Sequence, residues 1–459
     1  MTGGETGPGG GEGSAMIRRW AGERARLASS ARRLAAITRA GRLAPDTSRR
    51  GFLVGAAGAG LAVPAARSLG GVRQLPALAL DAASAQATAS QQNLALTPWF
   101  AALSNRLSAR CNVVCLGDSI TEGVHATGPP STGFMNRWVE RLADMLRSRY
   151  PTQGVSGGGR GFIGAVSTGE TSFSWPTTLS GSPATAQTAG PKAKFVQLAS
   201  SGQSITFSLV GDSAEIMWTQ AGFGGTFSWA VDGGPSTNVS TNGSGNADGK
   251  LTHISLGAAG PHTLVLSWVS GRSNIDGVIE NNGDHGHGIS VHDAGHYGWQ
   301  TSNWVNALSN GAPSGPAGGI ASLAPGAVII TLGTSDQFSG VVPATFQSHL
   351  QAIIAAIEAR LTAPYPAFIL CMLPARAGQS GYTYPWSQYV SAALNVAAAD
   401  TSGPGGSSIV SVLDFTSIPT MPAADSDSYG FWQPGDLIHP SNRGHQMIAD
   451  CLTAFLSQS

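Results

Sequence analysis

Two short stretches of the sequence hold the residue types that nucleophilic catalysis needs. In "CLGDSITEGV" Ser119 follows an apolar run, and in "DLIHPSNRGH" Asp436 and His439 stand three residues apart. A serine hydroxyl attacks a carbonyl at neutral pH only if a base removes its proton and an acidic group holds that base in the right tautomer. We therefore expect Ser119 to be the nucleophile, His439 its base and Asp436 the orienting acid. Taken alone, Ser119 would be a turn serine and Asp436 a local cap.

Two glycines behind further apolar runs could support such an attack. Gly298 lies in "AGHYGWQTS" and Gly333 lies in "LGTSD". A glycine lets its backbone N–H come close to a developing oxyanion, because no side chain stands in the way. Both stretches are therefore candidates for stabilising the oxyanion.

The strand and helix patterns place all these stretches at one edge of a sheet. Apolar runs typical of buried strands occupy residues 112–117, 288–295, 326–333, 367–373 and 408–415. Helical patterns alternate with them, which predicts a parallel sheet covered by helices on both faces. Ligands of such sheets bind beyond the carboxyl ends of the strands, where the candidate residues fall.

Residues 166–283 interrupt this pattern with short alternating segments separated by Gly, Asn, Ser and Pro. They predict an all-β sandwich inserted between the first and second strands of the α/β domain. The expected strands are "AKFVQLA", "SITFSLV", "AEIMWTQ", "TFSWAVDG", "LTHISL" and "HTLVLSWV". Trp218, Trp229 and Trp268 lie within them and are expected in the sandwich core, whereas Trp175 lies in a loop and is freer to bind a sugar.

The four motif stretches, in this order, resemble the SGNH (GDSL) hydrolase superfamily of esterases and lipases. "GDSIT" is similar to its first block, "AGHYGWQTS" to the second, "LGTSD" to the third and "DLIH" to the last. The resemblance covers residues 111–165 and 288–458. It implies a three-layer α/β/α, flavodoxin-like fold with Ser119 as nucleophile. It also implies an oxyanion hole formed by the N–H groups of Ser119 and Gly298.

One position departs from the family pattern. The third block of the family reads Gly-x-Asn-Asp, and Ser335 stands where the asparagine would donate to the oxyanion. Loss of one such donor costs about 10²- to 10³-fold in rate. Either Ser335 donates itself, or a water does, or the enzyme is slow. His296 and Tyr297, beside Gly298, are expected to bind substrate together with Trp432.

A histidine-rich stretch leads into the second strand and offers metal ligands by residue type. It contains His285, His287, His292, Asp293 and His296. We expect neither a metal nor another cofactor, because a glycine-rich loop explains the stretch and serine hydrolysis needs no metal.

Composition excludes some partners. The chain has 459 residues, only 11% of them charged, and a formal net charge of zero, so we expect no nucleic-acid binding. We expect a monomer.

The four cysteines lack metal-ligand spacing and are expected to be buried small residues. The sequence does not decide whether Cys111 and Cys451 form a disulfide.

The amino-terminal residues predict export. "TSRRGFLVGAAGAGLAVPAA" resembles a twin-arginine signal, with cleavage expected after Ala65 or later, after Ala85. Its apolar run of about 13 residues is too short for a transmembrane helix. We therefore expect a secreted or cell-envelope protein.

Together these patterns divide the chain into five parts. They are the extension and signal (1–65), a flexible linker (66–97), the first part of the hydrolase domain (98–165), the sandwich (166–283) and the second part of the hydrolase domain (284–459). The expected function is an exported serine esterase acting on short acyl esters, such as O-acetyl groups of cell-wall or extracellular polysaccharide. Alternatives are a lipase or lysophospholipase, an acetyltransferase, and a carbohydrate-binding or scaffold protein with a vestigial site.

Overall fold

The structure is a computed structural model, and it describes part of the chain. The described residues are 94–128, 133–155, 157–170, 172–309, 315–373, 382–417, 430–436 and 438–457. They all fall in the second of the chain's two units, Arg73–Ser459. The expected export signal and most of the expected linker lie outside the described residues. No helix among the described residues is long and apolar enough to cross a membrane.

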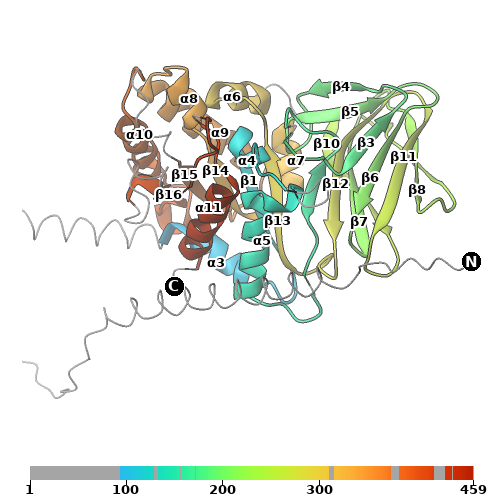
Figure 1. The fold of residues 1–459 in the computed structure, drawn as a ribbon, viewed down its shortest axis with the longest axis horizontal. Coiled ribbons are helices and arrows are strands. Elements are labelled where there is room, and N and C mark those ends of the chain that lie inside the picture. Colours follow the sequence, from blue (N-terminus) through green and yellow to red (C-terminus); the bar gives the residue numbers. More distant parts are fainter. Residues whose placement is uncertain are drawn as a thin grey trace, which may run out of the picture. The chain divides into compact units, whose positions relative to one another are not determined.

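The five apolar runs form one parallel sheet (Figure 1). Its strands are β1 (Arg110–Gly117), β13 (Gly288–Gly295), β14 (Pro325–Thr331), β15 (Ala367–Met372) and β16 (Val410–Asp414). They lie in the order β13-β1-β14-β15-β16, so β1 pairs with β13 on one side and with β14 on the other. In chain order this is 2-1-3-4-5, the flavodoxin-like arrangement, whose ligands bind at the switch point beside the first strand.

Helices cover both faces of the sheet. The helices α3 (Thr97–Ser104), α5 (Trp138–Arg149) and α11 (Asn442–Phe455) share one core with Val113 and Cys115 of β1. The opposite core joins Val114 and Leu116 to α6 (Thr301–Ser309), α7 (Pro316–Ser322), α9 (Pro343–Glu358) and α10 (Trp386–Ala399). Successive strand side chains point to opposite faces, which explains this division. The expected three-layer α/β/α fold is confirmed.

Short helical turns complete this part of the molecule. They are α4 (Ser119–Glu122), α8 (Thr334–Phe338) and the 3-10 turns η1 (Phe134–Asn136), η2 (Pro404–Gly406) and η3 (Phe415–Ser417). Both α4 and α8 begin directly behind strands of the sheet, so their first residues lie at its carboxyl edge.

Two antiparallel sheets lie between β1 and β13 in the sequence (Figure 1, green and yellow). One contains β2 (Gly161–Gly164), β4 (Ala184–Gln187), β5 (Lys194–Leu198), β7 (Ser213–Gln220), β10 (Ala247–Ser255) and β12 (Ser273–Asn281). The other contains β3 (Thr177–Ser180), β6 (Ser204–Leu209), β8 (Thr226–Val231), β9 (Thr237–Ser240) and β11 (His262–Ser270). We call these residues the insert.

The six strands expected from the sequence are all present in the insert, but five others were not predicted: β2, β3, β4, β9 and β12. The longest of these five is β12. Asp276 and Gly277 break its apolar run, and Ile275 and Ile279 contribute to two different cores, so no alternation of buried and exposed residues marks it. The two sheets share one core. The four tryptophans of the insert are only partly buried against that core, Trp175 among them.

All four cysteines are free, and three of them are buried in the α/β part. Burial raises the pKa of both Cys111 and Cys371 to about 12, so these thiols behave as small apolar groups. The disulfide between Cys111 and Cys451 that the sequence left open is not formed.

Candidate active site

Ser119 begins the short helix α4 directly behind β1. A Cβ on Gly117 would lie 2.1 Å from Thr121 Oγ1 and 2.8 Å from the Thr331 carbonyl oxygen, so glycine is required for this tight passage from strand to helix. Asp118 caps α4, and its Oδ1 accepts from the Ile120 N–H at 2.9 Å. Ser119 is thereby fixed at the carboxyl edge of the sheet.

The loop before α11 brings His439 to Ser119. Ser119 Oγ lies 2.9 Å from His439 Nε2, and His439 Nδ1 lies 3.0 Å from Asp436 Oδ2. Asp436 Oδ1 accepts from the backbone N–H groups of Ile438 and His439, each at 2.7 Å. Ser441 then caps α11 by accepting from two N–H groups of its first turn. The three residues that the sequence analysis paired are therefore in hydrogen-bond contact.

The charge state of Asp436 decides the tautomer of His439. Burial raises the pKa of Asp436, but the hydrogen bonds from His439 and Ile438 outweigh burial and hold that pKa well below its usual range. An ionised carboxylate only accepts hydrogen bonds, so the Nδ1 of His439 carries the proton. Its Nε2 is left with a lone pair directed at the Ser119 hydroxyl, which is what a base for that hydroxyl requires.

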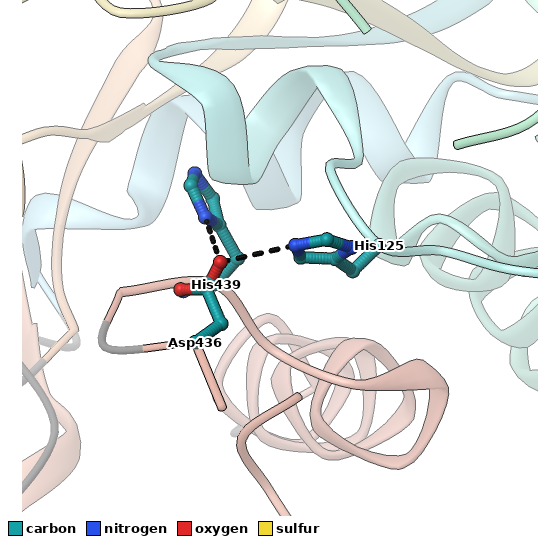
Figure 2. Close-up of side chains that lie close together, drawn as sticks. All are labelled: His125, Asp436 and His439. Atoms are coloured by element: carbon teal, nitrogen blue, oxygen red, sulfur yellow. Dashed lines mark hydrogen bonds and ion pairs between the residues drawn. The ribbon is translucent and has the colours of Figure 1, made fainter. Parts of the chain in front are cut away.

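A second histidine that the sequence analysis did not select reaches the same carboxylate. His125 Nε2 lies 3.0 Å from Asp436 Oδ2, and the rings of His125 and His439 meet edge to face with centroids 5.6 Å apart (Figure 2). No spacing rule marks His125, because its position depends on the chain reversing after α4 at Gly123, whose φ is +100°.

The loop after β13 presents Gly298 with a φ of +72°, in the left-handed region that favours glycine. Tyr297 beside it is 45% exposed, and its backbone N–H donates to Thr168 Oγ1 of the insert at 2.7 Å. His296 is buried, and its Nδ1 lies 2.6 Å from the Lys192 carbonyl oxygen. Burial lowers the pKa of His296 to about 4, so this imidazole is neutral and positions the loop.

Ser335 lies in α8, next to the residue that precedes the nucleophile. Its hydroxyl donates to Asp118 Oδ2 at 3.2 Å. Burial raises the pKa of Asp118 to about 7, although the hydrogen bonds from Ile120 and Ser335 act against burial. The single hydroxyl hydrogen of Ser335 is thus directed at Asp118 in this structure.

Trp432 is covered rather than presented at the surface. It is 4% exposed, its ring meets that of Phe431 edge to face, and both belong to the core beneath α5 and α11. A backbone bridge between Trp432 and Pro440 closes the loop that carries Asp436 and His439. Trp432 therefore lies in the loop that carries Asp436 and His439, but little of its ring is exposed for contact with a substrate.

A cluster of buried charges lies beneath the loop that carries Gly298. It contains Glu122, Arg137, Glu140, Lys192 and Asp293. Asp293 Oδ2 accepts from Arg137 at 2.5 Å and from Lys192 at 2.7 Å. Burial alone would raise the pKa of Asp293, but the two cations lower it below its usual range. A lysine of the insert thus completes a charge cluster of the α/β part, which periodicity in the sequence does not reveal.

The same contact region ties the nucleophile helix to the insert. Glu122, the last residue of α4, accepts from the Thr168 N–H at 2.5 Å, from the Thr168 hydroxyl and from the Ser167 hydroxyl at 3.1 Å. Since the Thr168 hydroxyl also accepts from Tyr297, one residue of the insert joins the helix that begins with Ser119 to the loop that carries Gly298.

The histidine-rich stretch does not converge on one point. His296 faces Lys192, Asp293 faces two cations, and burial lowers the pKa of His292 to about 3. The ring of His285 lies against that of His253 of β10, with centroids 3.8 Å apart and the ring planes tilted by 38°. Among the described residues, the group with metal-ligand proximity is His125, Asp436 and His439, which belong to the site itself.

Comparison with known proteins agrees with this geometry. Residues 272–447, less than half of the chain, match the model of the GDSL-like lipase/acylhydrolase family. The match includes Gly298, Ser335, Asp436 and His439 but begins after Ser119. A search of curated proteins found no significant relative. The family match and the triad geometry together support an ester hydrolase, in which residues 272–447 are similar to the GDSL-like lipase/acylhydrolase family.

Several solved structures share limited similarity with the chain. A family two carbohydrate esterase from Clostridium thermocellum, in complex with cellohexaose, is 18% identical over 59% of this chain and 97% of that one, with a TM-score of 0.27. A family two carbohydrate esterase from Cellvibrio japonicus is 13% identical over 61% and 96%, with a TM-score of 0.26. A putative lipolytic protein of the G-D-S-L family from Desulfitobacterium hafniense is 19% identical over 36% and 81%, with a TM-score of 0.27. Because these three TM-scores are below 0.5, the similarities carry no functional argument. The assignment as an ester hydrolase rests on the family match and on the geometry of the site.

Proposed function

We propose that this ester hydrolase removes short acyl groups, such as O-acetyl substituents of an extracellular or cell-wall polysaccharide. The proposal is carried by the continuous line of hydrogen bonds from Ser119 Oγ through His439 to Asp436, at 2.9 and 3.0 Å. This line lies at the switch point of a parallel sheet, where substrates of such folds bind.

The proposed reaction follows from the tautomer of His439. His439 Nε2 takes the hydroxyl proton as Ser119 Oγ bonds to the ester carbonyl carbon, and the resulting imidazolium gives that proton to the departing alcohol oxygen. The acyl group then remains on Ser119. Water attacks this acyl-enzyme with its proton passing to His439 Nε2, and the carboxylic acid leaves as the proton returns to Ser119 Oγ.

The oxyanion of both tetrahedral intermediates is assigned to the backbone N–H groups of Ser119 and Gly298. Ser335 has a lesser role, because its hydroxyl must leave Asp118 before it donates to the oxyanion. Such donors act most strongly where water is excluded, and Ser119 is 4% exposed.

Two observations support a small acyl group on a sugar. Because Ser119 is almost fully covered, a compact acetyl group is a better fit than a long acyl chain. Tyr297, 45% exposed beside Gly298, offers an aromatic face of the kind that packs against sugar rings. His296 anchors the loop that carries Gly298 and Tyr297, because its Nδ1 contacts the Lys192 carbonyl oxygen.

Export by the twin-arginine route is part of the proposal and rests on the sequence alone. The paired arginines Arg49 and Arg50 and the apolar run behind them fit such a signal. Fractionation of cells that express the full chain, with the Arg49→Lys/Arg50→Lys double variant as control, tests it. Equal retention of both proteins in the cytoplasm would contradict it.

Hydrolysis of p-nitrophenyl esters from acetate to palmitate tests the reaction and the acyl length together. We expect the highest kcat/KM with acetate and loss of activity in Ser119→Ala. Release of acetate from an acetylated polysaccharide, compared with the deacetylated polymer, tests the sugar substrate. A preference for palmitate would favour a lipase, and equal rates for wild type and Ser119→Ala would contradict the assignment of Ser119.

A further inference from the structure

We infer that His125 is a positioning residue of the active site, which holds the carboxylate of Asp436 in place through Oδ2. The inference rests on the proposed function and goes beyond the Ser119, His439 and Asp436 triad. Figure 2 shows the arrangement: the imidazoles of His125 and His439 both point at one oxygen of Asp436, each from 3.0 Å.

The hydrogen bonds of Asp436 show why a second imidazole matters. Oδ1 accepts from the N–H groups of Ile438 and His439, and Oδ2 accepts from His439 Nδ1 and His125 Nε2. A carboxylate has about four lone-pair sites, so it can accept all four of these hydrogen bonds at once. His125 is the one donor among them that does not come from the loop of Asp436. It therefore fixes the carboxylate against movement of that loop.

The backbone of His125 is held in a costly conformation that serves this contact. Its φ is +64°, in the left-handed region that a residue with a Cβ rarely adopts. Its N–H donates to Ser172 Oγ of the insert at 3.1 Å. The preceding residue, Val124, accepts from His445 of α11 through its carbonyl oxygen at 3.1 Å, and Thr127 accepts from Asn442.

These anchors come from both sides of the site. His445 and Asn442 of α11 bond to the backbone of this segment, and Ser172 of the insert bonds to the backbone of His125. Further ionisable groups that face this segment are His445, Glu170 through Ser172, and Arg137 beside Gly123. Burial lowers the pKa of His445 to about 3, so this imidazole stays neutral and acts as a fixed donor.

The electrostatic consequence has a definite sign. The hydrogen bond from His125 polarises Asp436 Oδ2 toward His125. The attraction between this oxygen and a positively charged His439 is therefore weaker than it would be without His125. Without His125, the carboxylate would interact more strongly with the positively charged imidazolium that His439 becomes during the reaction. The carboxylate would also be less restrained, so the orientation of His439 toward Ser119 would be less fixed.

Two substitutions separate this role from a structural one. His125→Asn suits the left-handed backbone, but its amide is one bond too short to reach the position of Nε2. His125→Gln places an amide donor at the equivalent position. His253→Asn, an exposed histidine on β10, is the matched control.

We expect kcat for p-nitrophenyl acetate to fall about tenfold in His125→Asn at unchanged KM, and to return to within about threefold of wild type in His125→Gln. The acidic side of the pH profile of kcat should differ between His125→Asn and wild type, because the charge on Asp436 Oδ2 is no longer shared with a second donor. His253→Asn should leave the rate and the pH profile unchanged.

Labelling of Ser119 by a fluorophosphonate gives a readout that does not depend on the natural ester. Slower labelling of His125→Asn than of wild type is the expected result. Equal labelling rates and equal pH profiles would overturn the inference, as would equal losses in the Asn and Gln variants with an unmoved pH profile. Failure of the wild-type protein to label at Ser119 would instead overturn the proposed function and, with it, this inference.

Discussion

The two halves of the active site are held in different ways. On the side of the base, Asp436 and His439 lie in one short loop, and the contacts described above join them to each other, to Ser119 and to His125. On the side of the oxyanion, the loop of Gly298 is held by Thr168 and Lys192, which come from the insert.

This difference shows which half depends on the insert. The base half would keep the hydrogen bonds among Ser119, His439, Asp436 and His125 without the insert, and would lose the bond from the backbone N–H of His125 to Ser172. The oxyanion half would lose the two contacts that Thr168 and Lys192 make with its loop, although the His296 N–H would still donate to the Gly117 carbonyl oxygen of β1. We therefore expect changes in the base half to abolish the reaction, and changes at the insert contact to slow it without altering its pH dependence.

The largest effect is expected at Asp436. Asp436→Asn keeps the shape of the side chain but removes the charge that selects the tautomer of His439, so kcat should fall by about 10³- to 10⁴-fold. Turnover of p-nitrophenyl acetate by the purified variant measures the loss. A fall of less than tenfold would mean that another group orients the base.

A smaller effect is expected at the contact with the insert. Thr168→Val keeps the volume but loses the hydroxyl that joins Glu122 to the Tyr297 N–H, so kcat should fall about tenfold as the Gly298 donor moves. Thr168→Ser keeps the hydroxyl and serves as the matched control. Equal kcat in the Val variant and wild type would show that the insert does not support the oxyanion hole.

The Ser335 position tests whether the oxyanion half lacks a donor. Ser335→Asn should raise kcat by about three- to tenfold, because an amide reaches further than a hydroxyl and can donate to both Asp118 and the oxyanion. The kcat of Ser335→Asn and of wild type for p-nitrophenyl acetate measures this effect. Unchanged or lower turnover would indicate that the site is adapted to serine.

The remaining expected effect concerns stability rather than rate. The folded protein holds the pKa of Asp118 at about 7, above its ordinary value of 3.8, because the side chain is buried. Between these pH values the folded state binds more protons than the unfolded state, so the free energy of unfolding decreases as pH rises through this window.

Asp118→Asn cannot titrate and removes this contribution, which is at most about 4 kcal/mol. Urea unfolding of wild type and variant at pH 4.5 and pH 7.5 measures it. We expect the variant to lose less stability than wild type between the two pH values. An identical loss in both proteins would show that Asp118 does not titrate in this range.

The sequence was sufficient for features that rest on local patterns. The five strands of the parallel sheet were predicted because buried parallel strands are continuous apolar runs. The alternating helices were predicted because apolar residues recur at helical spacing, as the buried Phe346 and Ile353 of α9 do. Asp436 and His439 could be paired because they share one loop. Ser119 followed from its place behind the first strand.

The features that the sequence did not reveal depend on contacts between distant segments. His125 meets Asp436 across more than 300 residues, and Lys192 meets Asp293 across about 100. Strand β12 was missed because both of its faces are buried, so its burial does not alternate. Such contacts are set by how segments that are distant in the chain pack together in space, and no periodicity records that packing.

Mass spectrometry of the acyl-enzyme tests the central claim most directly. The protein is mixed with p-nitrophenyl acetate, quenched in acid within the first turnovers and digested. We expect one acetyl group on the peptide that contains Ser119, and none on that peptide in Ser119→Ala. Acetyl transfer to a different residue, with ester hydrolysis retained in Ser119→Ala, would contradict the account.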